Sequence, residues 1–353
     1  MKKIFLSIAL SALSFNAEAA LQLHAEGKNP NYLFEADPKA LASSVQLVFR
    51  TGSMADPKGK EGLASLAFRS LMRGTKQRSK EQFFATLERL GASLEVDVGA
   101  GRTILSLNTL SENFEPALAL MADAVLNPAV SENEISSLKE ESNAMLSQEL
   151  SNNRKILKRV FRQALFRSTS LAFPPEGTFF FFKQKTAYDI KLFLKNQIKS
   201  GSAVVAVSSN KAVREVKAAV EKAFAGLPEG DAPKLEIPHA GTLEGRTVYV
   251  VDRPGSTTTE VAIGHYGILA DHKERDHLEL GLFAFGEDMT SILFQELREK
   301  KGWTYGTAGG FDLFERPRRY PGAFMVWAFP QAEHTEELVL RALERSEEHT
   351  SEL

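Results

Sequence analysis

Cysteine is absent from the 353 residues of this sequence, and tryptophan occurs only twice. Without cysteine the chain can form no disulfide, no catalytic thiol, no thiolate metal site and no cysteine-linked lipid anchor. Any metal would have to be held by histidine, aspartate or glutamate. An excess of charge is also absent, because 43 basic residues stand against 45 acidic ones and leave a net charge of −2. We therefore expect no nucleic-acid partner, since no basic field attracts one.

A hydrophobic run long enough to span a membrane is missing as well. The N-terminal apolar stretch Ile4–Phe15 is too short, at about 1.5 Å per residue, to cross a hydrocarbon layer of about 30 Å. Lys2 and Lys3 precede it, and the small residues of Ala17–Ala19 follow it. This pattern is typical of a secretory signal peptide that is cleaved after Ala19. We expect residues 1–19 to be removed, which leaves a periplasmic protein without a membrane anchor.

The rest of the composition is typical of a folded protein, with 43% hydrophobic and 25% charged residues, and the length suggests two domains. Val45–Phe49 has the pattern of a strand, and Leu63–Met72 that of an apolar helix. Ser79 and Gln82 form a capping-box pattern at the start of a second helix, which Gly91 is placed to close. Strand and helix signals therefore alternate from the beginning.

A hairpin and two further helices are predicted next. Leu94–Val98 and Thr103–Leu110 alternate between apolar and polar residues and are expected to pair as a hairpin. Ser111 is placed as the N-cap of the helix that follows. The charged stretch 132–152 is predicted to be helical, with a solvated face. Short antiparallel pieces of this kind favour an α+β protein over a doubly wound parallel sheet.

The same order of patterns occurs a second time in the chain. Val261–Tyr266 resembles the first strand, and a helix is predicted over residues 276–288. Phe294–Lys300 before Gly302 matches the first capped helix, and Ala323–Phe329 matches the second strand of the hairpin. A helix over residues 334–343 then follows, as it does in the first copy.

We therefore predict two homologous halves, each an antiparallel-dominated sheet packed with helices. The first would span residues 21–235 and the second residues 236–344, joined by a linker rich in proline and glycine over residues 226–245. Because the second copy is only about half as long as the first, it is expected to be incomplete.

Two segments do not fit this pattern. Residues 179–190 begin with Phe179–Phe182, four adjacent aromatics where a polar connection is expected, and show neither helical nor strand periodicity. Residues 345–353 stand where an amphipathic helix should continue. Both strings resemble translated sequencing-adapter read-through, which would make them artefacts and the chain truncated. The alternative is an unusual natural aromatic loop and tail.

The first apolar helix resembles the zinc helix of a known peptidase family. Gly62–Thr75 is similar to that helix in the insulinase/pitrilysin family, the inverzincins. In that family an H-x-x-E-H motif supplies two histidine ligands and a general-base glutamate. The corresponding positions here hold Ser65, Phe68 and Arg69. They offer a poor zinc ligand, a ring that accepts no proton and a fixed positive charge.

The family's third ligand, a glutamate on a later helix, should fall near Met145–Glu149. The best register places Ser147 or Gln148 there; if Glu149 is used instead, one carboxylate alone does not hold zinc. His272 and His277 are five residues apart and do not share a helical face, so they are expected to be surface residues. The resemblance thus implies no cofactor in this chain, with zinc held by a partner subunit.

The resemblance covers nearly all of residues 35–344 and includes Pro174–Thr178. It is most specific at Leu293–Tyr305, where the family has an arginine and a tyrosine in a context such as L-R-E-K-x-G-x-x-Y. These two residues reach the substrate near the scissile bond in the family, and Arg298 and Tyr305 occupy their positions. An arginine can hold a peptide carbonyl or carboxylate, and a tyrosine hydroxyl can donate to an oxyanion. The alternative is a solvated Arg298 and a core Tyr305.

Three classes of function follow from these observations. The leading interpretation is the non-metal subunit of a heterodimeric periplasmic zinc endopeptidase, whose zinc-bearing paralogous subunit this chain supports with Arg298 and Tyr305. Its ligand would be a peptide substrate, and the division of labour is similar to that of mitochondrial processing peptidase. The second is a non-catalytic structural or peptide-holding homologue. The third is an independent hydrolase with a site of another kind, although the sequence contains no G-x-S-x-G motif.

Overall fold

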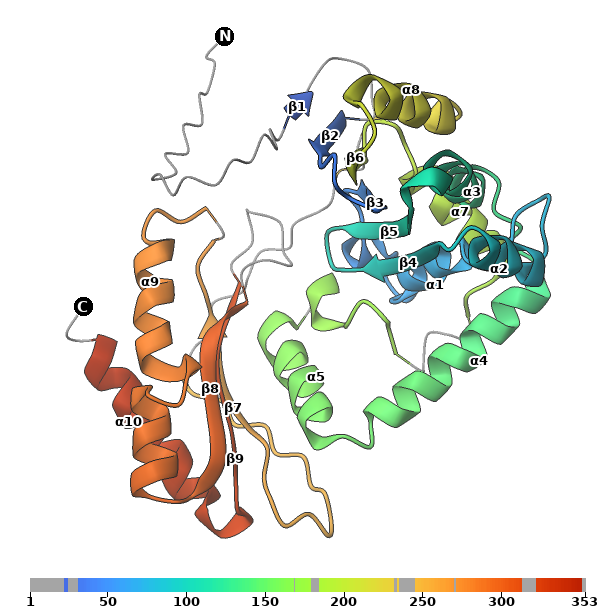
Figure 1. The fold of residues 1–353 in the computed structure, drawn as a ribbon. Coiled ribbons are helices and arrows are strands. Elements are labelled where there is room, and N and C mark those ends of the chain that lie inside the picture. Colours follow the sequence, from blue (N-terminus) through green and yellow to red (C-terminus); the bar gives the residue numbers. More distant parts are fainter. Residues whose placement is uncertain are drawn as a thin grey trace.

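The computed structural model describes residues 22–24, 31–167, 169–178, 184–231, 234, 245–269, 271–312 and 322–350. The signal-peptide prediction for residues 1–19 and the aromatic run Phe179–Phe182 lie outside these residues. Two lobes are visible in Figure 1, each built on one sheet. The predicted α+β class with two sheets packed by helices is confirmed.

The first lobe is built on a six-stranded sheet of order β1-β2-β6-β3-β5-β4. Only β2 and β6 run parallel, and every other neighbouring pair is antiparallel. β4 is an edge strand of this sheet. The strands are β1 (Gln22–His24), β2 (Asn31–Ala36), β3 (Ala42–Phe49), β4 (Ser93–Val98), β5 (Thr103–Leu110) and β6 (Ala203–Ser209).

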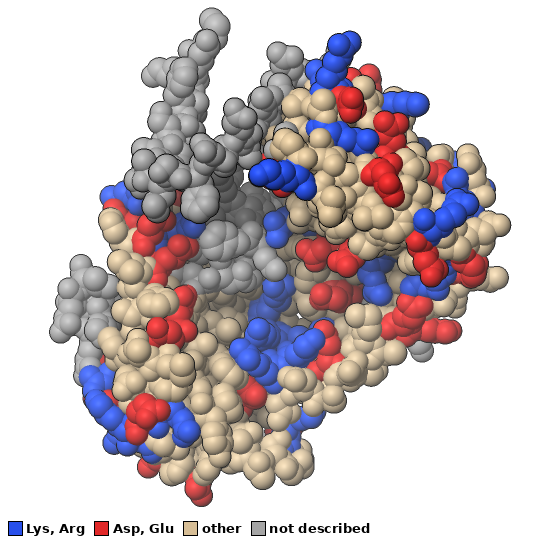
Figure 2. Space-filling view, in the orientation of Figure 1, with Lys and Arg blue, Asp and Glu red and all other residues tan. Residues whose placement is uncertain are grey.

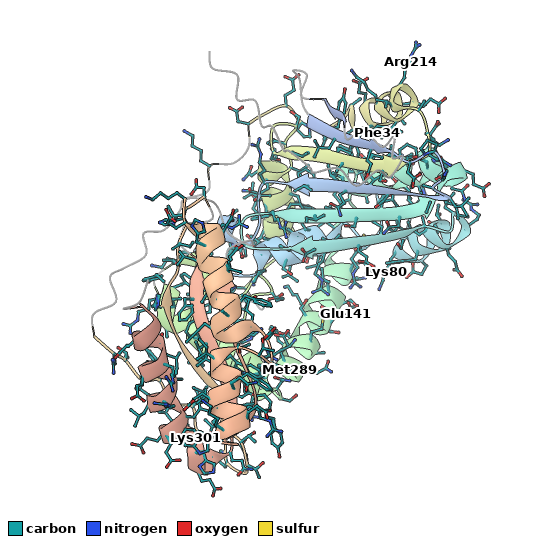
Figure 3. The ribbon with its side chains drawn as sticks, turned by 60° about the vertical axis from the view of Figure 1, so that its left-hand side comes forward. Phe34, Lys80, Glu141, Arg214, Met289 and Lys301 are labelled. Atoms are coloured by element: carbon teal, nitrogen blue, oxygen red, sulfur yellow. The ribbon has the colours of Figure 1, made fainter. Side chains whose placement is uncertain are left out.

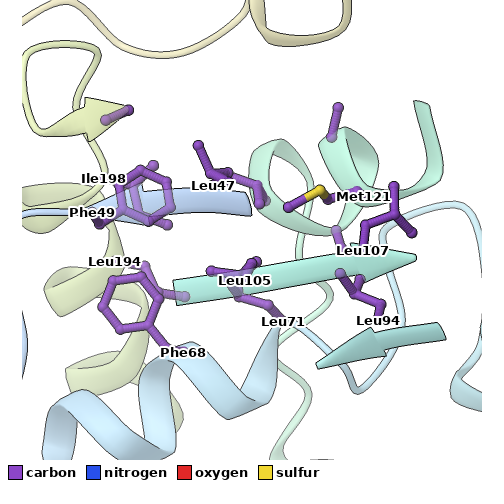
Figure 4. Packing of buried hydrophobic residues seen from close by; sticks show 14 of the residues in the cluster. Leu47, Phe49, Phe68, Leu71, Leu94, Leu105, Leu107, Met121, Leu194 and Ile198 are labelled. Carbon is purple, nitrogen blue, oxygen red and sulfur yellow. The ribbon is translucent and has the colours of Figure 1, made fainter. Parts of the chain in front are cut away.

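Helices cover one face of this sheet because its strands alternate between buried and half-exposed residues. In β3, Val45, Leu47 and Phe49 are fully buried, whereas the intervening side chains are half-buried or exposed. Figure 4 shows this core between the sheet and the helices, and Phe68 and Leu105 are among its buried residues. The helices that contribute to it are α1 (Leu63–Ser70), α2 (Lys80–Arg89), α3 (Phe114–Leu126), α4 (Glu132–Glu149), α7 (Ala187–Gln197) and α8 (Val213–Phe224).

Helix α5 (Asn153–Phe166) links the first lobe to the second. It follows α4 after a short turn and packs against β7 of the second sheet. The hydroxyl of Tyr266 donates a hydrogen bond to the Leu165 carbonyl, and the Phe166 ring lies 5.9 Å from the Tyr266 ring. Buried side chains from both lobes, among them Met54, Leu171 and Ala323, meet in one hydrophobic cluster. The two lobes therefore share a small core of their own.

The second lobe repeats the strand order of the first. Its sheet has the order β7-β9-β8, in which β7 (Val261–Tyr266), β9 (Ala323–Pro330) and β8 (Thr304–Asp312) correspond to β3, β5 and β4. Between β7 and β8 lie α9 (Arg275–Leu282) and the π-helical η4 (Phe283–Glu287) and η5 (Phe294–Lys300). After β9 comes α10 (Thr335–Thr350). The internal repeat inferred from the sequence is visible in this topology.

Several local predictions are confirmed. Ser79 and Gln82 form a reciprocal capping box, in which the Gln82 N–H donates to the Ser79 hydroxyl over 3.3 Å and the Ser79 N–H to the Gln82 amide over 3.0 Å. Gly91 and Gly302 both have positive φ, at 56° and 68°, which glycine adopts without a side-chain clash. β4 and β5 form the predicted hairpin.

Other local predictions are wrong. Ser111 is not an N-cap: it begins a 3-10 turn, and its hydroxyl lies 3.0 Å from that of Ser43 instead of binding the helix. Residues 187–190 are helical, because Thr186 and Asp189 form a capping box at the start of α7. The interpretation of residues 179–190 and 345–353 as artefacts stays a prediction, although α10 continues through residues 345–350. The domain boundary at residue 235 stays a prediction, since residues 235–244 are not among those described.

No helix in the described part of the chain combines the length and the apolar character that crossing a membrane requires.

Candidate functional site

Helix α1 carries the positions of the degraded zinc motif, and its start is held in place by a carboxylate and a glycine contact. The Asp56 carboxylate accepts the N–H groups of Gly62 and Ala64, at 2.6 and 2.7 Å. Gly62 has a φ of 89°. A Cβ there would meet the Glu176 carbonyl oxygen and Gly177 Cα, both at 2.8 Å. The segment Pro174–Thr178 therefore lies directly against the start of α1.

The three motif positions have different surroundings. Phe68 is fully buried, and its ring lies 5.7 Å from the Phe49 ring and 6.3 Å from the Phe193 ring. Ser65 is also buried, at 5% exposure. Arg69 is half-buried and turns toward α4. Phe68 thus packs in the core, and Arg69 is the motif position whose side chain contacts α4.

The residues of α4 that Arg69 contacts are Ser142 and Met145. The guanidinium donates to the Ser142 hydroxyl over 3.0 Å and lies 3.8 Å from the Met145 sulfur. Ser147 and Gln148, which the sequence register placed here, are exposed, and the Ser147 hydroxyl donates to the Asn143 carbonyl instead. Arg69 therefore contacts α4 about one turn before Ser147 and Gln148, and the place of the third ligand stays a prediction.

This set of side chains does not fit a zinc ion. The motif positions hold a serine hydroxyl, a phenyl ring buried in the core and a guanidinium that contacts a serine and a thioether. None of these is a good zinc ligand, and the fixed positive charge repels a cation. Among the described residues, no three histidine, aspartate or glutamate side chains gather closely enough to hold a metal. No chemical step through zinc can therefore be assigned to this chain.

A cavity of about 260 Å³ opens beside Arg69. Arg73, in the turn that follows α1, forms a two-pronged ion pair with Glu141 of α4 and lies 3.8 Å from Glu134. The side chains around the cavity come from α1 and the turn after it, from α2, from β4 and from α4, and are Arg69, Met72, Arg73, Lys80, Phe84, Val96, Leu138 and Glu141. This cavity could not be predicted from the sequence, because its lining residues are far apart in the chain.

The second predicted pair, Arg298 and Tyr305, lies together in the second lobe. The Arg298 guanidinium carbon is 5.3 Å from the centre of the Tyr305 ring. Tyr305 is 64% exposed, so the alternative that it is a core residue is excluded. Arg298 lies on η5 and Tyr305 on β8, which are in contact.

Tyr305 begins an aromatic row across the second sheet. Its ring stacks on Phe329 at 6.3 Å, and Phe329 stacks on Trp327 at 4.9 Å. The guanidinium of Arg154, from α5 of the first lobe, lies 3.7 Å from the Trp327 ring centre. The row therefore has an arginine at each end, and only Arg298 and Tyr305 of it were found from sequence.

The helix that carries Arg298, η5, is attached to α10 through a buried carboxylate. Glu296 is 5% exposed, and it accepts two hydrogen bonds from Arg341 of α10, at 2.9 and 2.8 Å. Lys300 donates to it over 3.2 Å. The Arg341 hydrogen bonds lower the pKa of Glu296 to about 2, with further lowering from Lys300. η5 is thus joined to α10 by charge as well as by apolar packing.

The two parts of the site lie in different lobes. Figure 3 shows Lys80 and Glu141 near α1, far from Lys301, which follows the helix of Arg298. Between them, Lys and Arg gather over α5 in Figure 2. The sequence of α5 contains five basic residues and no acidic one. The structure brings Arg298 to Tyr305 but does not bring that pair to Ser65, Phe68 and Arg69.

Known proteins resemble the chain in sequence. The profile described as "Insulinase (Peptidase family M16)" matches residues 32–178, and the one described as "Peptidase M16 inactive domain" matches residues 185–352. An "Uncharacterized zinc protease" of Rickettsia bellii is 26% identical over 295 residues, 82% of this chain and 69% of that protein. The "Non-peptidase homolog YmxG" of Helicobacter pylori is 24% identical over 312 residues, 86% of this chain and 70% of that protein.

A solved structure resembles the fold. The peptidase M16 inactive domain from Pseudomonas fluorescens superposes with a TM-score of 0.82 at 24% identity, covering 94% of this chain and 79% of that one. Together the two profiles account for nearly all of the chain from residue 32 onward. The chain therefore belongs to the insulinase family of M16 peptidases.

Proposed function

We propose that this chain is the non-metal subunit of a heterodimeric zinc endopeptidase. It would pair with a paralogous subunit that carries H-x-x-E-H, and it would help to bind the peptide and stabilise the transition state there. The proposal is supported by a homologue described as a non-peptidase and by a match to a profile described as an inactive domain.

One observation carries the proposal: the exposed Tyr305 hydroxyl and the Arg298 guanidinium are kept together although α1 has lost its ligands. A guanidinium can hold a peptide carbonyl, and a phenol can donate to the oxyanion that forms when the carbonyl is attacked. Because α1 of this chain offers no zinc ligands, the metal that the pair would serve would belong to another chain. A signal peptide over residues 1–19, cleaved after Ala19, would direct this chain to the periplasm, where the complex would assemble.

The test uses the full chain and a paralogue with an intact H-x-x-E-H motif from the same organism, made separately and together. We expect a complex by size-exclusion chromatography with light scattering, zinc only in the paralogue by metal analysis, and peptide cleavage only by the mixture. Cleavage by this chain alone, or one zinc per copy of this chain, would overturn the proposal. A mixture no more active than the paralogue would do the same.

A further inference from the structure

The cavity beside Arg69 holds more positive charge than its own carboxylates neutralise. Arg73 is paired with Glu141, and it is also the cation that lies within 4 Å of Glu134. Arg69 donates to a serine hydroxyl and a thioether. Within the described residues, neither Arg69 nor Lys80 has a carboxylate within ion-pair distance. Two of the three cations around the cavity therefore lack a direct counter-charge.

The lack of a nearby carboxylate matters most for Arg69, because its guanidinium is half-buried. Burial, followed by the nearby Arg73, lowers the pKa of the Arg69 guanidinium, and Glu141 and Glu176 offset this only in part. An arginine in a protein stays charged, so the guanidinium must keep its charge in a place where water reaches it incompletely. A bound anion would supply the missing charge through short, directional hydrogen bonds.

Part of the lining of the cavity is apolar. Met72, Val96 and Phe84 contribute to it, and Phe84 is 44% exposed although it is a large aromatic. Its ring packs edge-on against the buried Phe83, 5.9 Å away, which fixes its orientation. A ligand that fits would therefore join an anionic group to an apolar one.

The size of the cavity limits that ligand. At about 260 Å³ it is smaller than the roughly 300 to 1,000 Å³ of sites that enclose a drug-sized molecule. A single amino-acid residue fits this scale better than a nucleotide or a cofactor does. Carboxylate is the anionic group of a peptide, and a guanidinium binds it with two parallel hydrogen bonds.

We propose that this cavity binds a peptide carboxylate, with Arg69 and Lys80 on the carboxylate and Phe84 against an adjoining apolar side chain. In this chain a guanidinium stands at a position of the metal motif and anchors a substrate group. The choice of a peptide as ligand rests on the proposed function. The carboxylate can come from the C-terminus of the peptide or from an aspartate or glutamate side chain, and the two sources are distinguished below.

The experiment measures peptide binding to the full chain alone by fluorescence anisotropy. Four N-terminally labelled hexapeptides are compared: one pair ends in phenylalanine with a free carboxylate or an amide, and one pair, amidated, carries an internal Glu-Phe or Gln-Phe. We expect the acid of at least one pair to bind at least tenfold more tightly than its neutral partner, and this preference to shrink as sodium chloride is raised. The pair that discriminates identifies the source.

Variants connect the preference to the cavity. Arg69→Gln should raise the Kd of the preferred acid at least tenfold and remove the preference, and Lys80→Gln should raise it severalfold. Arg214→Gln is the matched control, because Arg214 is exposed on α8 at the far end of the lobe (Figure 3), and we expect its Kd to stay within twofold. If circular dichroism shows that Arg69→Gln does not fold, Lys80→Gln and Phe84→Ala replace it as test variants, and both should raise the Kd of the preferred acid.

Equal binding of acid and neutral peptides in both pairs, or no binding of any of them, would overturn the carboxylate site. The carboxylate site would also be overturned if folded Arg69→Gln protein kept its preference for the acid peptide. The same holds if the preference survived in both Lys80→Gln and Phe84→Ala. These results are separable from the proposed function. Failure to assemble with a zinc-bearing paralogue leaves the anisotropy result intact, and a catalytically competent complex can exist without any preference for the acid.

Discussion

Arg69 differs from the other two substituted motif positions because its polar side chain forms a hydrogen bond to α4. Phe68 packs in the core, and Ser65 is buried. Arg69 reaches Ser142 on the helix where the family's third ligand is expected. The contact between the two helices is thus kept, with a guanidinium in place of metal ligands.

The Tyr305 hydroxyl provides the cleanest test of a catalytic contribution. Tyr305→Phe removes one oxygen and keeps the ring that stacks on Phe329. If the hydroxyl donates to an oxyanion in the assembled enzyme, kcat should fall on the order of 10² to 10³. Assembly and zinc content should not change.

The control for this prediction is Tyr188→Phe, the same change at another exposed tyrosine, for which we expect no change in turnover. Arg298→Ala should lower turnover as Tyr305→Phe does. Turnover within twofold of the parent for both Tyr305→Phe and Arg298→Ala would favour the structural homologue instead.

Glu296 should contribute stability that depends on pH. Its folded pKa of about 2 lies below the usual value of 4.5, so its stabilising effect is complete above about pH 4.5 and is lost as the pH falls toward 2. Glu296→Gln should lower the free energy of unfolding by about 2 kcal/mol at pH 7, because it removes the buried carboxylate that accepts hydrogen bonds from both Arg341 and Lys300.

Urea denaturation between pH 3 and pH 7 measures this effect. The gap between parent and Glu296→Gln should be constant from pH 7 to pH 5 and should narrow below pH 4.5. Glu299→Gln changes an exposed carboxylate on the same helix and serves as control. A gap that stays the same down to pH 3 would contradict the prediction.

At the scale of single elements, the start of α2 matters to the cavity because it carries Lys80 and, one turn later, Phe84. Ser79→Ala removes the side-chain half of the capping box and should cost about 1 kcal/mol of unfolding free energy. Ser147→Ala is the matched control, since the same change inside α4 removes a hydroxyl that only bonds back to its own helix.

Thermal or urea unfolding of the two variants compares them directly. We expect Ser147→Ala to be neutral or slightly stabilising, because alanine is the better helix former. Equal destabilisation by both variants would show that the capping box does not hold α2.

The contribution of Asp56, at the start of α1, to the free energy of unfolding should change with pH in the opposite direction to that of Glu296. Burial raises the pKa of Asp56 to about 7, although the N–H groups of Ala64 and Gly62 lower it. The folded state then holds a proton that the unfolded state releases near pH 4, so stability from this group is lost as the pH rises through 7. Burial also lowers the pKa of the neighbouring Lys185 to about 8, so from pH 8 upward stability rises again.

Asp56→Asn keeps an acceptor oxygen and removes the titration. The stability of the parent relative to this variant should fall between pH 5 and pH 8, as measured by urea denaturation at each pH. A difference that does not change over this range would show that the carboxylate titrates as it does in the unfolded chain.

Elements with complete local signals could be predicted from the sequence. The capping box at Ser79, the glycine end at Gly91 and the β4–β5 hairpin depend on neighbours within a few residues, and they are present. The π-helical form of η5 could not be predicted, because its apolar spacing is the same as that of an α-helix. Strand β6 was not predicted, and its parallel pairing with β2, far away in the sequence, has no local signal.

At the scale of the whole molecule, the repeat was predictable and the site was only partly so. Matching patterns in both halves indicated two related sheets, and β3-β5-β4 corresponds to β7-β9-β8. Arg298 and Tyr305 were found through a family resemblance. The cavity beside Arg69 was missed because four separate elements line it, and only tertiary packing brings them together.

The aromatic row has a consequence for optical measurements. Both tryptophans of the chain, Trp303 and Trp327, belong to the second lobe, so intrinsic tryptophan emission reports on that lobe, whereas far-ultraviolet circular dichroism reports on both. Trp303 stacks on His334 at 6.0 Å, and Trp327 is covered by Arg154 of the first lobe. A change in emission that precedes the loss of dichroism on heating would therefore mark the separation of the lobes before either one unfolds.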